Sequence, residues 1–100
     1  MSDILLTLLS FHALQERLLD ALLQTEGIAI LCSTPAAVHG LSADTLSSSE
    51  QVLGHAKATE IRLLINHSLL PALLDKLQKE FSGAGLRYWT TSVLASGELK

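Results

Sequence analysis

Two histidines that flank a polar segment are the residues of this chain most suited to binding a metal or a proton. His39 and His55 each stand beside a glycine, Gly40 and Gly54 respectively. Imidazole binds borderline metals and titrates near neutral pH, so the pair could bias the segment between two arrangements, with the glycines as hinges. The spacing of the pair matches no compact metal motif, and two solvated loop histidines are the simpler interpretation.

The other reactive side chains form no catalytic pattern. Cys32 lies within an apolar run, where a small buried hydrophobic side chain is its expected role. Ser10 and His12 are a nucleophile and a base that stand close together in the sequence, and no obvious residue orients that histidine. His12 and His67 precede helical segments, where capping or surface roles are usual. An enzyme is thus the least favoured of three function classes, after a regulatory binding protein and a ligand-free structural subunit.

A second candidate site follows residue 82, where two glycines precede a cation. Gly83 and Gly85 allow backbone conformations with positive φ and the close approach of another group. Arg87 could hold an anionic ligand or a carboxylate of an adjacent subunit, and the second alternative is favoured. The predicted ligand-binding set is therefore His39, Gly40, Gly54, His55, Gly83, Gly85 and Arg87.

The hydrophobic pattern predicts four strands that would position these residues. Short apolar runs occur at 4–10 and 28–33, and Pro35 is expected to end the second. Residues 59–65 alternate in direction, with Ile61, Leu63 and Ile65 on one face and Glu60, Arg62 and Leu64 on the other, and the strand at 86–94 is β-branched and aromatic. Segment 4–10 is apolar on both of its faces, which is typical of a strand that is buried on both sides.

Two amphipathic helices are predicted between the strands. The first should begin at Ala13 and end at Gly27, and the second should begin after Ser68 as the N-cap, with Pro71 in its first turn. Asp75 and Lys79 can pair on the exposed side of the second helix. The stripe of the first helix consists of Leu14, Leu18, Ala21 and Leu22, widened by Leu19 and Leu23.

The order of these elements predicts an α+β fold of the ferredoxin-like βαββαβ type, as a single domain over residues 1–100. It has an antiparallel four-stranded sheet, two helices on one face, and a long loop at 40–58 between strands two and three. Because the helices cover one face only, a second copy of the chain is expected to cover the other.

Composition argues against two classes of partner. The net charge is −3 and aromatic residues make up 4% of the chain, so nucleic acid, which needs clustered cations for its phosphates and aromatic rings for its bases, is not an expected partner. No segment reaches the roughly 20 apolar residues that a membrane span needs. Asp3 stands where a signal peptide would be basic, and a single cysteine suits a reducing compartment. We therefore expect a soluble cytoplasmic protein that does not insert into membranes.

The loop at 40–58 is predicted to bind a partner. Serines keep it soluble, while its apolar residues have no regular partner nearby, as in segments that order on contact. A flexible linker without a role is the alternative. The predicted partner-binding residues are Leu41, Ser42, Leu46, Glu50, Val52 and Leu53.

The segments HGLSADTLSSSEQVLGH and FSGAGLRYWTTSVLASGEL resemble a bacterial PII-like family of unknown function, encoded beside heavy-metal efflux systems of the resistance-nodulation-division type. The resemblance implies a homotrimer with inward-facing sheets and a projecting loop that reads a partner. It further implies a small-molecule or metal effector, and a membrane transporter or its regulator as partner. PII proteins hold nucleotide phosphates with basic residues near the last strand, but here no lysine lies between Ser82 and Arg87. Nucleotide binding in the usual mode is therefore not expected, and no cofactor is predicted.

Overall fold

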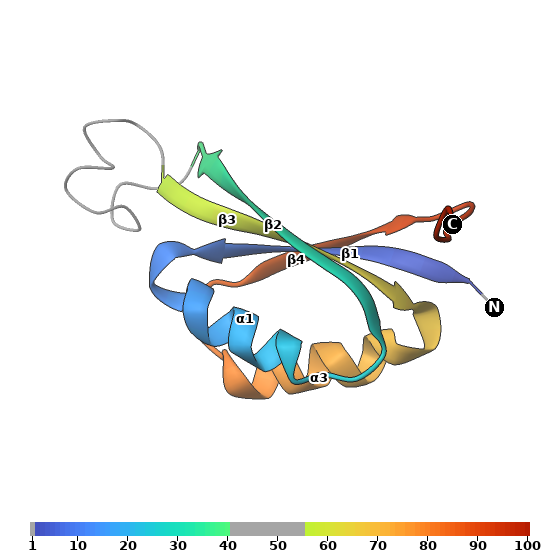
Figure 1. Ribbon diagram of the computed structural model, residues 1–100. Helices are drawn as coiled ribbons and strands as arrows, with labels where there is room; N and C mark the ends of the chain where they lie inside the picture. The colour runs from blue at the N-terminus through green and yellow to red at the C-terminus, as the bar shows by residue number, and fades with distance from the viewer. Residues whose placement is uncertain (1, 41–55) are drawn as a thin grey trace.

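The computed structural model describes residues 2–40 and 56–100, and the elements in these ranges are four strands, two helices and two 3₁₀ turns (Figure 1). They are β1 (Asp3–Phe11), η1 (His12–Leu14), α1 (Gln15–Leu23), β2 (Ile28–Val38), β3 (Ala56–Asn66), η3 (His67–Leu69), α3 (Leu70–Glu80) and β4 (Arg87–Ser92).

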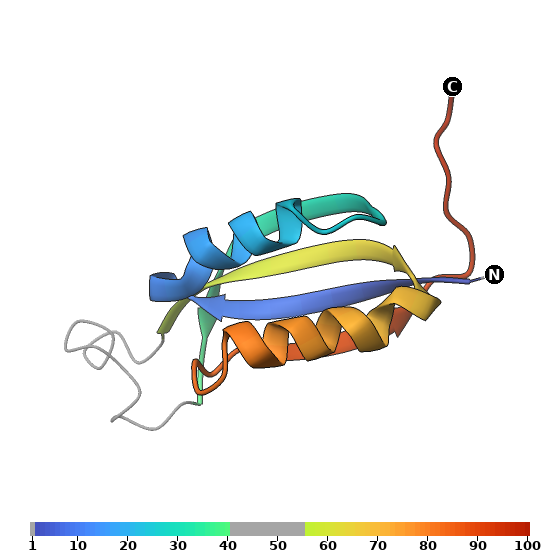
Figure 2. The same cartoon turned by 90° about the horizontal axis from the view of Figure 1, so that it is seen from below.

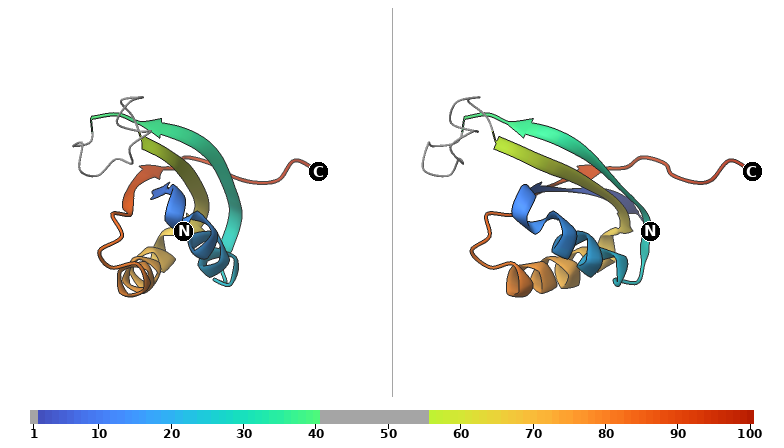
Figure 3. Two further views of the ribbon diagram at one scale, coloured as in Figure 1. Left: turned by 90° about the vertical axis from the view of Figure 1, so that its left-hand side faces the viewer. Right: turned by 60° about the vertical axis from the view of Figure 1, so that its left-hand side comes forward.

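The strands form one antiparallel sheet in the order β2-β3-β1-β4, so β1 and β3 are central and β2 and β4 are its edges. Both helices lie on the same face of this sheet (Figure 3). Seen from the helical side, α1 lies along β2 and β3, while α3 lies along β1 and β4 (Figure 2). The predicted ferredoxin-like fold class is confirmed.

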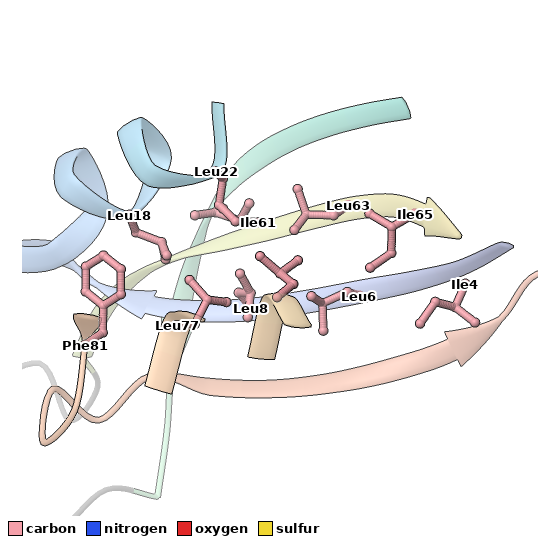
Figure 4. Close-up of a cluster of buried hydrophobic side chains, with 11 residues drawn as sticks. Ile4, Leu6, Leu8, Leu18, Leu22, Ile61, Leu63, Ile65, Leu77 and Phe81 are labelled. Atoms are coloured by element: carbon pink, nitrogen blue, oxygen red, sulfur yellow. The ribbon is translucent and has the colours of Figure 1, made fainter. Parts of the chain in front are cut away.

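The core fills the space between the helices and the sheet (Figure 4). Alternate residues of β1 and β3 point toward the helices, and Leu6 pairs with Leu63 at the centre of the layer. Leu6 and Leu63 have no solvent exposure at all. The buried cluster comprises Ile4, Leu6, Leu8, Leu18, Leu22, Ile61, Leu63, Ile65, Leu73, Leu77 and Phe81.

The helix ends differ in detail from the sequence prediction. Ser68 is not the N-cap; the side chain of Asn66 accepts hydrogen bonds from the Ser68 backbone N–H (2.9 Å) and hydroxyl (2.8 Å). The chain then makes one 3₁₀ turn before α3, where Pro71 lies in the first turn as predicted, because no donor is needed there. The predicted exposed pair of Asp75 and Lys79 is also present, at 3.0 Å.

Helix α1 is shorter than predicted. It begins at Gln15 after the 3₁₀ turn and ends at Leu23, so Gly27 lies in the following turn rather than at the helix end. Leu23, predicted to widen the buried stripe, is 71% exposed, because it is the last residue of α1 and points about 100° away from the buried Leu22. The Lys76 ammonium of α3 donates to the Ala21 carbonyl (3.4 Å), and so joins the end of α1 to α3.

Strands β2 and β3 are longer than predicted. Pro35 does not end β2, which continues to Val38. An edge strand tolerates proline because one of its two hydrogen-bonding sides has no neighbour. Strand β3 begins at Ala56, so residues 56–58 pair with β2 and do not belong to the predicted 40–58 loop. The rest of that loop, at 41–55, lies outside the described residues.

Candidate functional site

The sheet face opposite the helices has no second layer packed on it in the described structure. Strand register and alternation define this open face. Its residues are Ile30, Cys32 and Thr34 on β2, Glu60, Arg62 and Leu64 on β3, Leu5, Thr7 and Leu9 on β1, and Arg87, Trp89 and Thr91 on β4. No described helix covers it (Figure 3).

The open face is apolar at one end and charged at the other. Ile30, Leu64 and Leu5 stand side by side in one row across three strands. Ile30 is 57% exposed and Trp89 is 46% exposed, which is unusual for side chains of this size in a folded chain. A contiguous apolar patch of this kind marks an interaction surface.

Cys32 lies on this open face and is exposed, so its predicted role as a buried hydrophobe is wrong. The prediction rested on the position of Cys32 within the apolar run at 28–33. In the structure β2 is an edge strand and alternation divides its residues between two faces. Leu31 packs against the core, while Cys32 points to the uncovered side.

A groove of about 420 Å³ runs between α3, the turn at 81–86 and β4. Its volume falls in the range of small-molecule sites, and its wall is as polar as it is apolar. Its apolar lining is Leu8, Leu74, Leu77, Phe81 and Leu86, and its other lining residues are Asp75, Gln78, Ser82, Gly83, Gly85 and Tyr88.

The predicted glycines shape this groove. Gly83 and Gly85 have φ of +77° and +75°, which confirms the expectation of positive-φ backbone. A Cβ atom at either position would meet nothing within 4 Å, so backbone conformation and not space requires glycine there. Tyr88 also lines the groove, and the sequence analysis did not predict it as a site residue. Alternation along the strand could have indicated it, because neighbouring residues of a strand point to opposite faces and Tyr88 follows Arg87 directly.

Arg87 lies apart from the two glycines with which it was grouped. Arg87 of β4 pairs with Leu9 of β1, whose side chain lies on the open face, so Arg87 belongs to that face as well. The next residue, Tyr88, lines the groove. Among the described residues that line the groove, only Asp75 is charged, and it is already paired with Lys79. A phosphate would therefore find no cation among the described lining residues.

Another cavity, of about 370 Å³, is lined by residues of β2 and β3 together with Gln15. Its polar lining residues are Gln15, Ser33, Thr34, Lys57 and Thr59, and the Thr59 hydroxyl donates to Gln15 Oε1 at 2.7 Å. His39 and Gly40 follow β2 and are exposed, and Gly40 has φ of +82°.

The remaining predicted site residues lie outside the described residues. These are Gly54 and His55 of the ligand-binding set, and all six predicted partner-binding residues, Leu41, Ser42, Leu46, Glu50, Val52 and Leu53. Within residues 2–40 and 56–100, no group of three His, Cys, Asp or Glu side chains comes together to hold a metal. No helix in the same ranges is long and apolar enough to cross a membrane.

Comparisons with known proteins agree with this fold. A DUF3240 family protein from Shewanella baltica superposes with a TM-score of 0.82 at 16% identity, covering 100% of this chain and 99% of that one. A proposed PII-like signalling protein from Thermus thermophilus gives 0.63 at 18% identity, covering 93% and 90%. Both likenesses show the fold alone. No curated protein matches the sequence. The model of the family described as protein of unknown function (DUF3240) matches residues 1–100, and the chain therefore belongs to that family.

Proposed function

We propose that this protein is a PII-like regulatory protein that forms a homotrimer through its open face, senses a small ligand or a metal, and docks on a larger partner. It acts by binding and not by catalysis. The observation that carries the proposal is the open face itself, where Ile30, Leu64 and Trp89 lie on the side that the helices leave uncovered.

Association of several copies would bury the apolar residues of the open face, which a single chain leaves exposed. A 100-residue chain has a small core, and the two helices of the described residues already pack on the other face of the sheet. Burial of apolar surface contributes about 25 cal/mol per Å², so covering the row of Ile30, Leu64 and Leu5 adds stability that the isolated chain lacks.

The groove beside α3 is the proposed ligand site of this regulator. Its mixed lining, with Leu77 and Phe81 beside Gln78 and Tyr88 and no cation among the described lining residues, suits a small neutral molecule better than a nucleotide. A metal is the alternative effector, and His39 and His55 are the residues proposed to bind it.

The proposed partner is a membrane transporter or its regulator, and the resemblance to proteins encoded beside heavy-metal efflux systems supports this choice. A cytoplasmic location follows from that role. The segment proposed to dock on the partner is 41–55, which lies in the sequence between the end of β2 at Val38 and the start of β3 at Ala56.

Native mass spectrometry of protein taken directly from cells tests the assembly. We expect a mass of three chains, together with any small molecule that the groove retains. The same protein diluted to micromolar concentration should still sediment as a trimer. A monomer at that concentration would contradict the proposed function.

Shortening the loop tests the docking proposal. Replacing residues 42–52 with a short Gly/Ser turn should leave the trimer intact, because the open face lies on other residues, while capture of partners from cell extract is lost. A control variant replaces 42–52 with a Gly/Ser segment of the same length and separates the role of length from that of side chains. Capture of the same partners with unchanged affinity by the shortened protein would exclude the loop as the docking segment.

A further inference from the structure

On the open face, β3 and β4 lie on either side of β1 and carry side chains that attract one another. In one row, Glu60 of β3 and Arg87 of β4 lie on either side of β1. In the next row, Arg62 of β3 and Trp89 of β4 occupy the corresponding positions. Each row therefore holds a cation and a group that attracts it, a carboxylate in one row and an aromatic ring in the other.

These groups have little to pair with inside their own chain. Glu60 and Arg87 are two strands apart, so their Cα atoms are roughly 10 Å from each other. Arg87 makes no ion pair with any described residue. Among the described residues, Glu60 forms an ion pair with Arg62 alone, at 4.0 Å, and Arg62 Nε is buried without a hydrogen-bond partner. A pair this long between half-exposed side chains contributes little.

A head-to-tail contact between two copies would supply the missing partners. In such a contact the β4 side of one copy meets the β3 side of the next, and successive contacts close a ring. Glu60 and Arg87 lie in the same row of the sheet. If the strands of the two copies run parallel, the rows of the two copies lie at the same height, and Arg87 of one copy therefore lies opposite Glu60 of the next. The same arrangement brings Trp89 level with Arg62.

We propose that the trimer closes through an ion pair between Arg87 of one copy and Glu60 of the next, with Trp89 over the guanidinium of Arg62 in the adjacent row. This inference rests on the proposed trimer and names the contacts that hold it. Apolar contact alone would let two faces slide past one another, whereas the charged row fixes their register and excludes a wrong pairing.

Charge reversal tests the pairing. Arg87→Glu and Glu60→Arg should each raise the concentration at which the trimer dissociates at least about tenfold, because each sets like charges against each other. The double variant Glu60→Arg/Arg87→Glu should return to near the wild-type value. Lys79→Glu and Glu80→Arg, exposed on α3 away from the open face, make the same charge changes and should have no effect.

Cross-linking tests whether the contact joins two copies. In a Cys32→Ser background, cysteines at positions 60 and 87 of one chain are too far apart for an intrachain disulfide, which needs Cα atoms within about 7 Å. Oxidation with oxidised glutathione should therefore give covalent dimers and trimers, and neither cysteine alone should give trimers.

Three outcomes would overturn the inference. A wild-type trimer that neither cross-links between these cysteines nor recovers in the double reversal would show that the pairing is wrong while the trimer stands. A wild-type monomer would refute both the pairing and the proposed assembly. Covalent dimers without trimers would indicate a two-fold, face-to-face assembly and would also contradict the ring.

Discussion

A glutamate in place of Leu5 is expected to yield a folded monomer, whereas a glutamate in place of the next residue, Leu6, is expected to prevent folding. The two side chains leave β1 on opposite faces. Leu6 has no solvent exposure and lies among the core residues, so a charge there would be buried without a partner. That cost reaches several kcal/mol, a large part of the roughly 5–15 kcal/mol that usually holds a domain together.

Leu5 is only partly buried and faces the side that the helices leave open. A charge there remains solvated in the monomer and becomes costly only when another copy covers the face. Circular dichroism should report a native fold for Leu5→Glu and an unfolded chain for Leu6→Glu, while sedimentation should report loss of the trimer for Leu5→Glu. Thr90→Glu, an exposed position on β4, is the control and should change neither. Wild-type sedimentation of Leu5→Glu would exclude the open face as the interface.

Truncation of Leu22 is expected to destabilise the protein by about 2–5 kcal/mol, the range for a buried leucine replaced by alanine. Leu22 is 1% exposed at the end of α1 and packs in the core. Its neighbour Leu23 is 71% exposed, so Leu23→Ala should change stability by no more than about 0.5 kcal/mol.

Urea unfolding of both variants at one protein concentration provides the measurement, since assembly makes stability depend on concentration. The pair is matched in residue type, helix and size of the change, and differs only in the direction of the side chain. Equal losses for the two variants would mean that a partner copy covers Leu23, or that α1 is oriented differently.

The sequence predicted the type and order of the elements because their hydrophobic periods are strong and local. Strand 59–65 puts Ile61, Leu63 and Ile65 on one face, and helices are recognised by stripes such as the one that includes Leu18 and Leu22. The extra strand residues at 56–58 were missed because alanine and lysine are poor strand formers. They are held in β3 by pairing with β2, and such pairing is not visible in a local pattern.

The candidate site was predictable only in part, for the same reason. The positive φ of Gly83 and Gly85 is a local property of glycine in a tight turn, and it was predicted correctly. The groove forms only when α3 packs beside β4. Which of Arg87 and Tyr88 faces the groove depends on the register in which β4 pairs with β1. Residue type and spacing alone do not fix these long-range relations.

The central position of β1 has a consequence for synthesis on the ribosome. Its two neighbours, β3 and β4, both come later in the chain, and β3 ends at Asn66. At roughly 5–20 residues per second, β1 waits on the order of 3–10 s after its own synthesis before its first partner strand is complete. During that time a strand that is apolar on both faces has both of its hydrogen-bonding edges open. The nascent segment Asp3–Phe11 is therefore the part of the chain with most to gain from a chaperone, and the part most prone to pair with another unfinished copy.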